Sequence, residues 1–143
     1  MENILKKICD KKKIELEVTK SKCSIDSLKK LLTSKKNRNF KNLLESSQKN
    51  KINNIIAEIK KSSPSAGEII KNYRPEDIGV QYEKSGAGAI SILTESSFFE
   101  GHIDHMSTMN LKTNLPILRK DFIIDEYQIF ESKVFKADAI LLI

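Results

Sequence analysis

The sequence at residues 55–67 reads IIAEIKKSSPSAG, a short apolar run that ends in Ser, Pro and Gly. Such a run predicts a buried β-strand at residues 55–60 with a loop at its C-terminal end. Side chains alternate along a strand, so Glu58 and Lys60 should share a face. Charged side chains are rarely buried unless they are paired or functional, and this pair therefore marks a candidate site.

Three further apolar runs of the same kind follow, and we expect strands at residues 89–94, 116–120 and 139–143. Strands that recur roughly every 20–35 residues predict a parallel sheet with crossover helices, an α/β fold. Two closures are compatible with this order: an open doubly wound sheet, and part of a (β/α)8 barrel. In both, chemistry collects at the C-terminal ends of the strands.

The segments between these strands carry helix signals. Pro75 suits the first position of a helix, and Gly86 suits its end. A second helix is expected over about residues 103–111. Asp125 and Gln128 have the spacing of a capping box at the start of a third.

Residues 1–53 come before the first convincing strand and predict a helical N-terminal extension that packs on the main fold at residues 54–143. Three short helices are expected in it, over residues 2–18, after an N-cap at Ser24, and from Phe40. The polar tract at residues 45–54 predicts a loop.

Composition bounds the function. The 143 residues suffice for one compact domain, and the net charge of +6 favours anionic partners in general. Lysine is scattered along the whole chain and Trp is absent, so no nucleic-acid surface is expected. No apolar run reaches the roughly 18 residues of a membrane span, and no apolar signal-peptide core is present, which predicts a cytoplasmic protein without a membrane partner. Cys9 and Cys23 are expected to be reduced structural thiols.

Three charged side chains near strand ends are candidates for chemistry: Glu58, Lys60 and Lys120. Lys120 lies two residues beyond Leu118, so both point the same way along the strand. If Lys60 and Lys120 face one cavity at the strand ends, a lysine there can act as a general acid or bind an anionic group, and Glu58 can hold that lysine in place. The alternative is a structural Glu58–Lys60 pair with Lys120 in solvent.

Aromatic and polar side chains also follow the strands. Phe98 and Phe99 either line an apolar pocket or pack against a neighbouring helix, and Phe122 behaves similarly. A polar turn that offers hydrogen-bond donors follows the first strand, with Ser63, Ser65 and Gly67. His102 and His105 are three residues apart with no third ligand near them in the sequence, which favours a surface pair over a metal site.

Four stretches of this sequence together resemble the indole-3-glycerol phosphate synthase family. They are IAEIKKSSPSAG at 56–67, SILTE through FFEG at 91–101, LPILRKDFIID at 115–125, and YQI through ADAILLI at 127–143. Their order and spacing agree with the family, and the helical N-terminal extension is also similar. The resemblance covers nearly the whole chain.

The resemblance implies a (β/α)8 barrel of the TIM type that uses no cofactor and no metal. It implies ring closure of 1-(2-carboxyphenylamino)-1-deoxyribulose 5-phosphate, with loss of carbon dioxide and water, to indole-3-glycerol phosphate in tryptophan biosynthesis. By the same resemblance, Lys120 matches the general acid, Lys60 holds the substrate carboxylate, and Glu58 orients the lysine and the reacting hydroxyl. The expected substrate-binding residues are Ser63, Pro64, Phe99, Phe122 and Leu141.

Two departures from the family affect these expectations. Lys136 stands where the family usually has Gly, which carries a cost if this position requires a positive φ. The sequence also resembles only the first half of the family, without the second glutamate and the phosphate loops of the later strands. We therefore expect an N-terminal portion that is inactive by itself, or a non-catalytic half-barrel. Any fusion to another tryptophan-pathway enzyme is left undetermined by the sequence.

Overall fold

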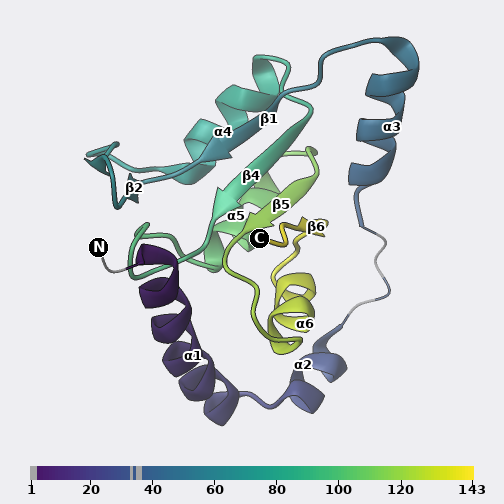
Figure 1. Cartoon of the computed structure of the whole chain (residues 1–143). Helices are drawn as coiled ribbons and strands as arrows, with labels where there is room; N and C mark the ends of the chain where they lie inside the picture. Colours follow the sequence, from purple (N-terminus) through teal and green to yellow (C-terminus); the bar gives the residue numbers. More distant parts are fainter. Residues whose placement is uncertain (1–2, 33, 35–36) are drawn as a thin grey trace.

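The computed structural model describes residues 3–32, 34 and 37–143. Within them, the centre of the molecule is a four-stranded parallel sheet with the order β1-β4-β5-β6 (Figure 1). The four strands are β1 (Ile56–Ile59), β4 (Ala89–Leu93), β5 (Ile117–Lys120) and β6 (Ala139–Ile140). Each strand pairs with the one before it in the main sheet, whereas a doubly wound sheet would reverse direction. The sheet is therefore about half of a (β/α)8 barrel, and the predicted α/β fold is confirmed.

Helices join the strands, as the sequence predicts. They are α4 (Pro75–Lys84), α5 (Asp104–Lys112) and α6 (Tyr127–Val134). Pro75 occupies the start of α4, and Gly86 follows that helix with a φ of 86°. The capping pair is present at α6: the Asp125 carboxylate accepts from the Tyr127 N–H, and the Gln128 side-chain oxygen accepts from the Asp125 N–H.

The main core lies between the sheet and helices α4 and α5. Its buried residues are Ile59, Ile90, Ile92, Met106, Met109, Ile117 and Ala137. Every residue of β4 is buried. The edge strand β1 is more open, and Ile56 is 40% exposed. The sheet is therefore fully buried at β4 and partly exposed at its edge strand β1.

Three helices precede the sheet: α1 (Ile4–Lys22), α2 (Ile25–Leu31) and α3 (Phe40–Asn50). The first two pack near α6 around Leu16, Leu28 and Tyr127, while α3 lies at the margin of the molecule (Figure 1). The predicted cap at Ser24 is present, because its side chain accepts from the Ser27 N–H at 3.2 Å. The division at residue 53 stays a prediction. No helix in the described ranges is long and apolar enough to cross a membrane.

Several predicted boundaries were wrong. The tract at 45–54 is not a loop throughout, because α3 continues to Asn50 and ends where Lys51 adopts a left-handed φ of 54°. The first helix runs on to Lys22, and its predicted first residue lies outside the described residues. The strand at 139–143 is cut to Ala139–Ile140, although the Leu141 N–H still donates to the Arg119 carbonyl of β5 at 3.1 Å.

A short antiparallel hairpin follows β1 and was missed from the sequence. It consists of β2 (Ser62–Ser63) and β3 (Gly67–Glu68). Gly67 has a φ of 66°, which glycine adopts without steric cost. The Ser63 hydroxyl accepts from the Ala66 N–H at 3.2 Å and closes the turn. The predicted polar turn is thus the tip of this hairpin.

Lys136, which stands where the family usually has Gly, adopts a left-handed conformation with a φ of 70°. Replacing it with glycine is expected to raise the free energy of unfolding by about 1 kcal/mol, because the steric cost of Cβ is removed. Urea denaturation followed by circular dichroism measures this change. The control is Lys84→Gly at the end of α4, which should destabilise by up to about 1 kcal/mol. A loss of stability in Lys136→Gly would contradict the prediction.

Candidate active site

Glu58 lies between two lysines at the C-terminal end of the sheet. Its Oε1 accepts from Lys60 Nζ at 2.8 Å, and its Oε2 accepts from Lys120 Nζ. β4 separates β1 from β5, yet the parallel register brings the three side chains together across it. The structure thus places all three predicted residues in one cluster. Lys120 is an ion-pair partner here rather than a solitary solvated lysine, while the chemical roles stay a prediction.

The net charge of Glu58, Lys60 and Lys120, here called the triad, favours binding of an anion. Two ammonium groups share one carboxylate, so the cluster carries a net positive charge, and its side chains are only 29–35% exposed. Burial raises the pKa of the Glu58 carboxyl, but the hydrogen bonds from Lys120 and Lys60 outweigh it and hold the pKa below its ordinary value of 4.5. Glu58 is therefore ionised at neutral pH and orients both lysines.

The lowered pKa of Glu58 predicts an acid dependence of stability. Above pH 4.5 the contribution of the ionised group is fully present, and it is lost as the pH falls towards the native pKa, because the unfolded chain takes up the proton first. The free energy of unfolding should therefore fall less steeply below pH 4.5 in Glu58→Gln than in the wild type. Urea titrations at a series of pH values measure both slopes. Glu45→Gln, on the exposed face of α3, should follow the wild type; parallel curves for all three proteins would contradict the prediction.

A cavity of about 420 Å³ adjoins Lys60. Ser63, Pro64 and Ser65 line it from the hairpin, and Phe99 and Phe122 line it from the loops after β4 and β5. The two phenylalanine rings lie 6.3 Å apart. Its size falls within the roughly 300–1,000 Å³ typical of small-molecule pockets. The cavity can take an apolar ring beside a cation.

The N-terminal helix completes this cavity, a contact that the sequence did not predict. Ile4, Leu5 and Ile8 of α1 also line it. The sequence held a signal, since these residues form the apolar stripe of the predicted first helix. Leu141 is not among the lining residues. Its N–H donates to the Arg119 carbonyl at 3.1 Å, and strand alternation puts its side chain on the same face as Lys120.

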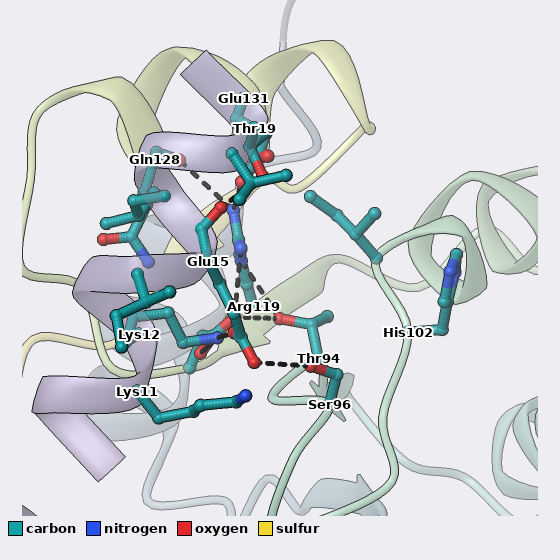
Figure 2. A pocket seen from close by; sticks show the side chains of 15 residues that line it. Lys11, Lys12, Glu15, Thr19, Thr94, Ser96, His102, Arg119, Gln128 and Glu131 are labelled. Atoms are coloured by element: carbon teal, nitrogen blue, oxygen red, sulfur yellow. Dashed lines mark hydrogen bonds and ion pairs between the residues drawn. The ribbon is translucent and has the colours of Figure 1, made fainter. Parts of the chain in front are cut away.

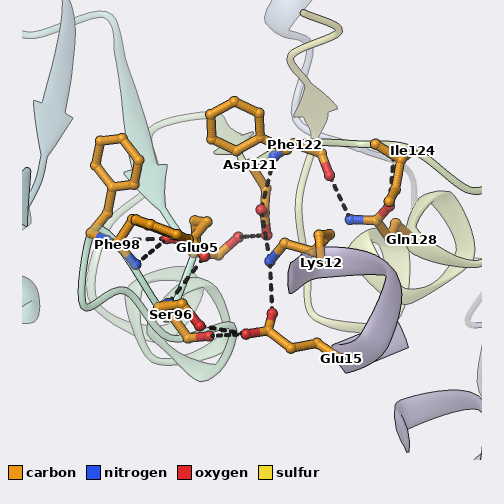
Figure 3. Close-up of polar contacts among 12 residues, drawn as sticks. Lys12, Glu15, Glu95, Ser96, Phe98, Asp121, Phe122, Ile124 and Gln128 are labelled. Atoms are coloured by element: carbon orange, nitrogen blue, oxygen red, sulfur yellow. Dashed lines mark hydrogen bonds and ion pairs between the residues drawn. The ribbon is translucent and has the colours of Figure 1, made fainter. Parts of the chain in front are cut away.

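The loops around the cavity are tied to one another. Lys61, at the base of the hairpin, makes a 2.5 Å ion pair with Glu100 in the loop after β4. In the same loop, Glu95 is fully buried and accepts from the N–H groups of Ser97, Phe98 and Phe99 (Figure 3). This carboxylate therefore shapes the loop that carries Phe99.

A second cavity, of about 460 Å³, lies between α1 and the other face of the sheet (Figure 2). Charged side chains fill its floor and already bind one another. Arg119 donates to Thr94, Asp121, Glu131, Ser132 and the Gln128 carbonyl. Lys12 is 6% exposed and pairs with Asp121 at 3.1 Å. Because these charges are mutually satisfied, the first cavity is the better candidate for a substrate.

His102 lies just before α5 and His105 lies in its first turn, and neither joins the site. His102 is exposed, whereas His105 is half-buried with its ring 5.5 Å from that of Tyr73. Burial lowers the pKa of His105, and the neighbouring His102 lowers it further. The expected surface pair is thus correct for one histidine only.

Comparison with known proteins gives a consistent result. A family model described as "Indole-3-glycerol phosphate synthase" matches residues 5–143. The indole-3-glycerol phosphate synthase of Campylobacter fetus subsp. fetus (strain 82-40) is 48% identical over 141 residues, covering 98% of this chain and 54% of that protein. That of Prochlorococcus marinus (strain AS9601) is 47% identical over 143 residues, covering 99% and 48%. The chain spans about half the length of the curated relatives it matches.

Proposed function

The chain belongs to the indole-3-glycerol phosphate synthase family, a family of lyases, and from this premise we propose that its triad and apolar cavity serve the ring closure of 1-(2-carboxyphenylamino)-1-deoxyribulose 5-phosphate. The product is indole-3-glycerol phosphate, with carbon dioxide and water released. One observation carries the proposal: two lysines share the Glu58 carboxylate beside a cavity walled by Phe99 and Phe122. A ring that carries a carboxylate matches this combination of cations and apolar walls.

Each residue has a role that its position supports. Lys60 borders the cavity and binds the substrate carboxylate, while the phenylalanines hold the aromatic ring. Lys120 donates a proton to the carbonyl oxygen as the ring carbon attacks the carbonyl carbon, so that the oxygen becomes a hydroxyl. Loss of carbon dioxide from the same ring carbon restores the aromatic ring. The hydroxyl then takes up a proton and leaves as water, while the neighbouring carbon that is bonded to nitrogen loses a proton and the C=C bond of the indole ring forms. Glu58 keeps Lys120 oriented and lies beside the departing hydroxyl.

The 143-residue polypeptide by itself is expected to bind this substrate without turning it over. The four described strands of its main sheet leave that sheet open, and the triad side chains remain about one-third exposed. Water in an open site competes for the lysines and weakens electrostatic stabilisation of a transition state. This exposure also favours the alternative for the isolated polypeptide, a half-barrel that binds but does not catalyse.

Calorimetric titration of the chain with the substrate tests the proposed roles. Lys60→Met and Lys120→Met should each weaken binding by roughly 10-fold or more, since a hydrogen bond to a charged group contributes about 1.5–3 kcal/mol. Lys112→Met is the matched control, because this exposed lysine at the C-terminal end of α5 belongs neither to the triad nor to the lining of the first cavity. Binding that is equal in all four proteins would contradict the proposal.

A product assay separates binding from catalysis. The rate of indole-ring formation is measured by the fluorescence of the product. We expect this rate to stay at the background level for both the wild type and Lys120→Met. Turnover by the wild type that Lys120→Met abolishes would overturn the expectation of inactivity and would support Lys120 as the proton donor. Turnover that survives this substitution would contradict that role.

A further inference from the structure

Strand alternation separates the end of β5 into two sets of side chains. Lys120 points towards Glu58, and Phe122 lines the first cavity. Arg119 and Asp121 face the opposite way, towards α1 and α6, and are 3% and 1% exposed. The same short segment therefore carries site residues on one face and a buried charge cluster on the other.

Asp121 connects three parts of the fold through one carboxylate. Its Oδ2 accepts from Thr94 Oγ1 at 2.7 Å and from Arg119 Nη2 at 3.0 Å. Its Oδ1 lies 3.1 Å from Lys12 Nζ and accepts from the Phe122 N–H at 2.8 Å (Figure 3). The carboxylate thus contacts α1, the end of β4 and the backbone of a residue that lines the first cavity.

Lys12 belongs to α1, the helix whose apolar residues also line that cavity. Its side chain is 8% exposed and lies between Asp121 and Glu15, the latter at 3.4 Å. Ile8 is one helical turn before Lys12, and Ile4 is one turn earlier still, so the three share a face of α1. The same face of α1 therefore carries the buried Lys12 and two of the apolar side chains that line the first cavity.

The rest of the cluster gives this contact a defined position. Arg119 reaches Glu131 of α6 at 2.8 Å, so Lys12 and Arg119 together face the carboxylates of Asp121 and Glu131. Removing Lys12 leaves an excess of negative charge at a place where water has little access. Burial raises the pKa of the Asp121 carboxyl, but Arg119, Lys12 and the Thr94 hydroxyl outweigh it and hold that pKa below 3.8.

We propose that Asp121 is a positioning residue for the active site: its buried ion pair with Lys12 docks α1 onto the end of β5 and thereby sets the positions of Lys120 and Phe122. The inference rests on the proposed function, because it treats Lys120 and Phe122 as parts of the site. The coupling itself is a property of the chain without substrate, and it is tested without one.

The test compares Lys12→Met with Lys13→Met, the same substitution at a neighbouring lysine whose side chain is 68% exposed. Amide hydrogen exchange reports the docking of α1. Side-chain NMR of Lys120, assigned by its loss in Lys120→Arg, reports the geometry of the triad. In Lys12→Met, amides around Ile8 should exchange roughly 100-fold faster, since the buried partner charge is left uncompensated. The Lys120 signal should shift in the same variant, while Lys13→Met leaves both unchanged.

A merely structural role gives a different pattern. If Lys12→Met destabilises the whole chain, amides of β4 and α1 accelerate together and the Lys120 signal of the folded protein stays in place, which would overturn the proposal. Lys12→Gln serves if the Met variant does not fold, and it is expected to show the same shift at smaller size. Lys12→Arg, which keeps the charge, should restore the wild-type Lys120 signal. None of these readouts needs substrate, so failure of the proposed function in the calorimetric test is separate from failure here.

Discussion

Replacing Arg119 with methionine is expected to lower the free energy of unfolding by about 3–5 kcal/mol, a large share of the stability of a small domain. Arg119 is 3% exposed, and its guanidinium binds Asp121 at 3.0 Å and Glu131 at 2.8 Å. Methionine fills a similar volume but leaves both carboxylates without their cation. The cost arises from these buried, unpaired charges rather than from lost packing.

Urea denaturation followed by circular dichroism measures this loss at neutral pH. Arg74→Met is the matched control, because Arg74 carries the same charge at the start of α4, pairs with Asp77 at 2.9 Å, and is 69% exposed. The control should lose less than about 1 kcal/mol, as is usual for surface ion pairs. Similar small losses in both variants would show that the cluster around Arg119 does not stabilise the fold.

Replacing Glu95 with alanine is expected to cost about 2–4 kcal/mol and to displace Phe99 from the cavity. The carboxylate is fully buried and accepts from three consecutive N–H groups at 3.0, 2.7 and 3.1 Å. Alanine leaves these donors unsatisfied, and the loop after β4 must rearrange to reach water. The ring of Phe99 moves with this loop, so its contact with Phe122 should weaken.

Two measurements check this second prediction. Urea denaturation gives the free energy of unfolding, and NMR cross-relaxation between the Phe99 and Phe122 rings gives their separation. Glu45→Ala, an exposed glutamate within α3, is the control and should change stability by less than about 0.5 kcal/mol. A Glu95→Ala variant with wild-type stability and an unchanged ring contact would show that the loop is held by other residues.

The order of the strands and helices followed from local patterns. Short apolar runs that end in turn residues predicted the four strands of the main sheet, and the lengths between them required parallel crossovers. Boundaries were less accurate, because a helix or strand ends where its partners end. α3 continues beyond its last apolar residue, Leu44, to Asn50, and β6 covers only the first two residues of its apolar run.

Part of the candidate site could also be predicted from local sequence patterns. Glu58 and Lys60 are two residues apart on one strand, so alternation alone put them on one face. Placing Lys120 beside this pair required one further inference, that the C-terminal ends of parallel strands lie at the same end of the sheet. The ion pairs of Glu58 with Lys60 and Lys120 agree with this inference. The α1 wall of the cavity was not foreseen, because periodicity identifies an apolar stripe without naming what it packs against.

The sequence by itself therefore determined the α/β order, the face shared by Glu58 and Lys60, and the family to which the chain is similar. Only the tertiary structure decided that Lys12 pairs with Asp121, more than a hundred residues away, and that Arg119 lies buried behind Lys120. Local sequence patterns predict that a lysine or arginine side chain is exposed to solvent. Whether it is buried depends on a carboxylate that the fold brings to it, and that partner is set by topology rather than by neighbouring residues.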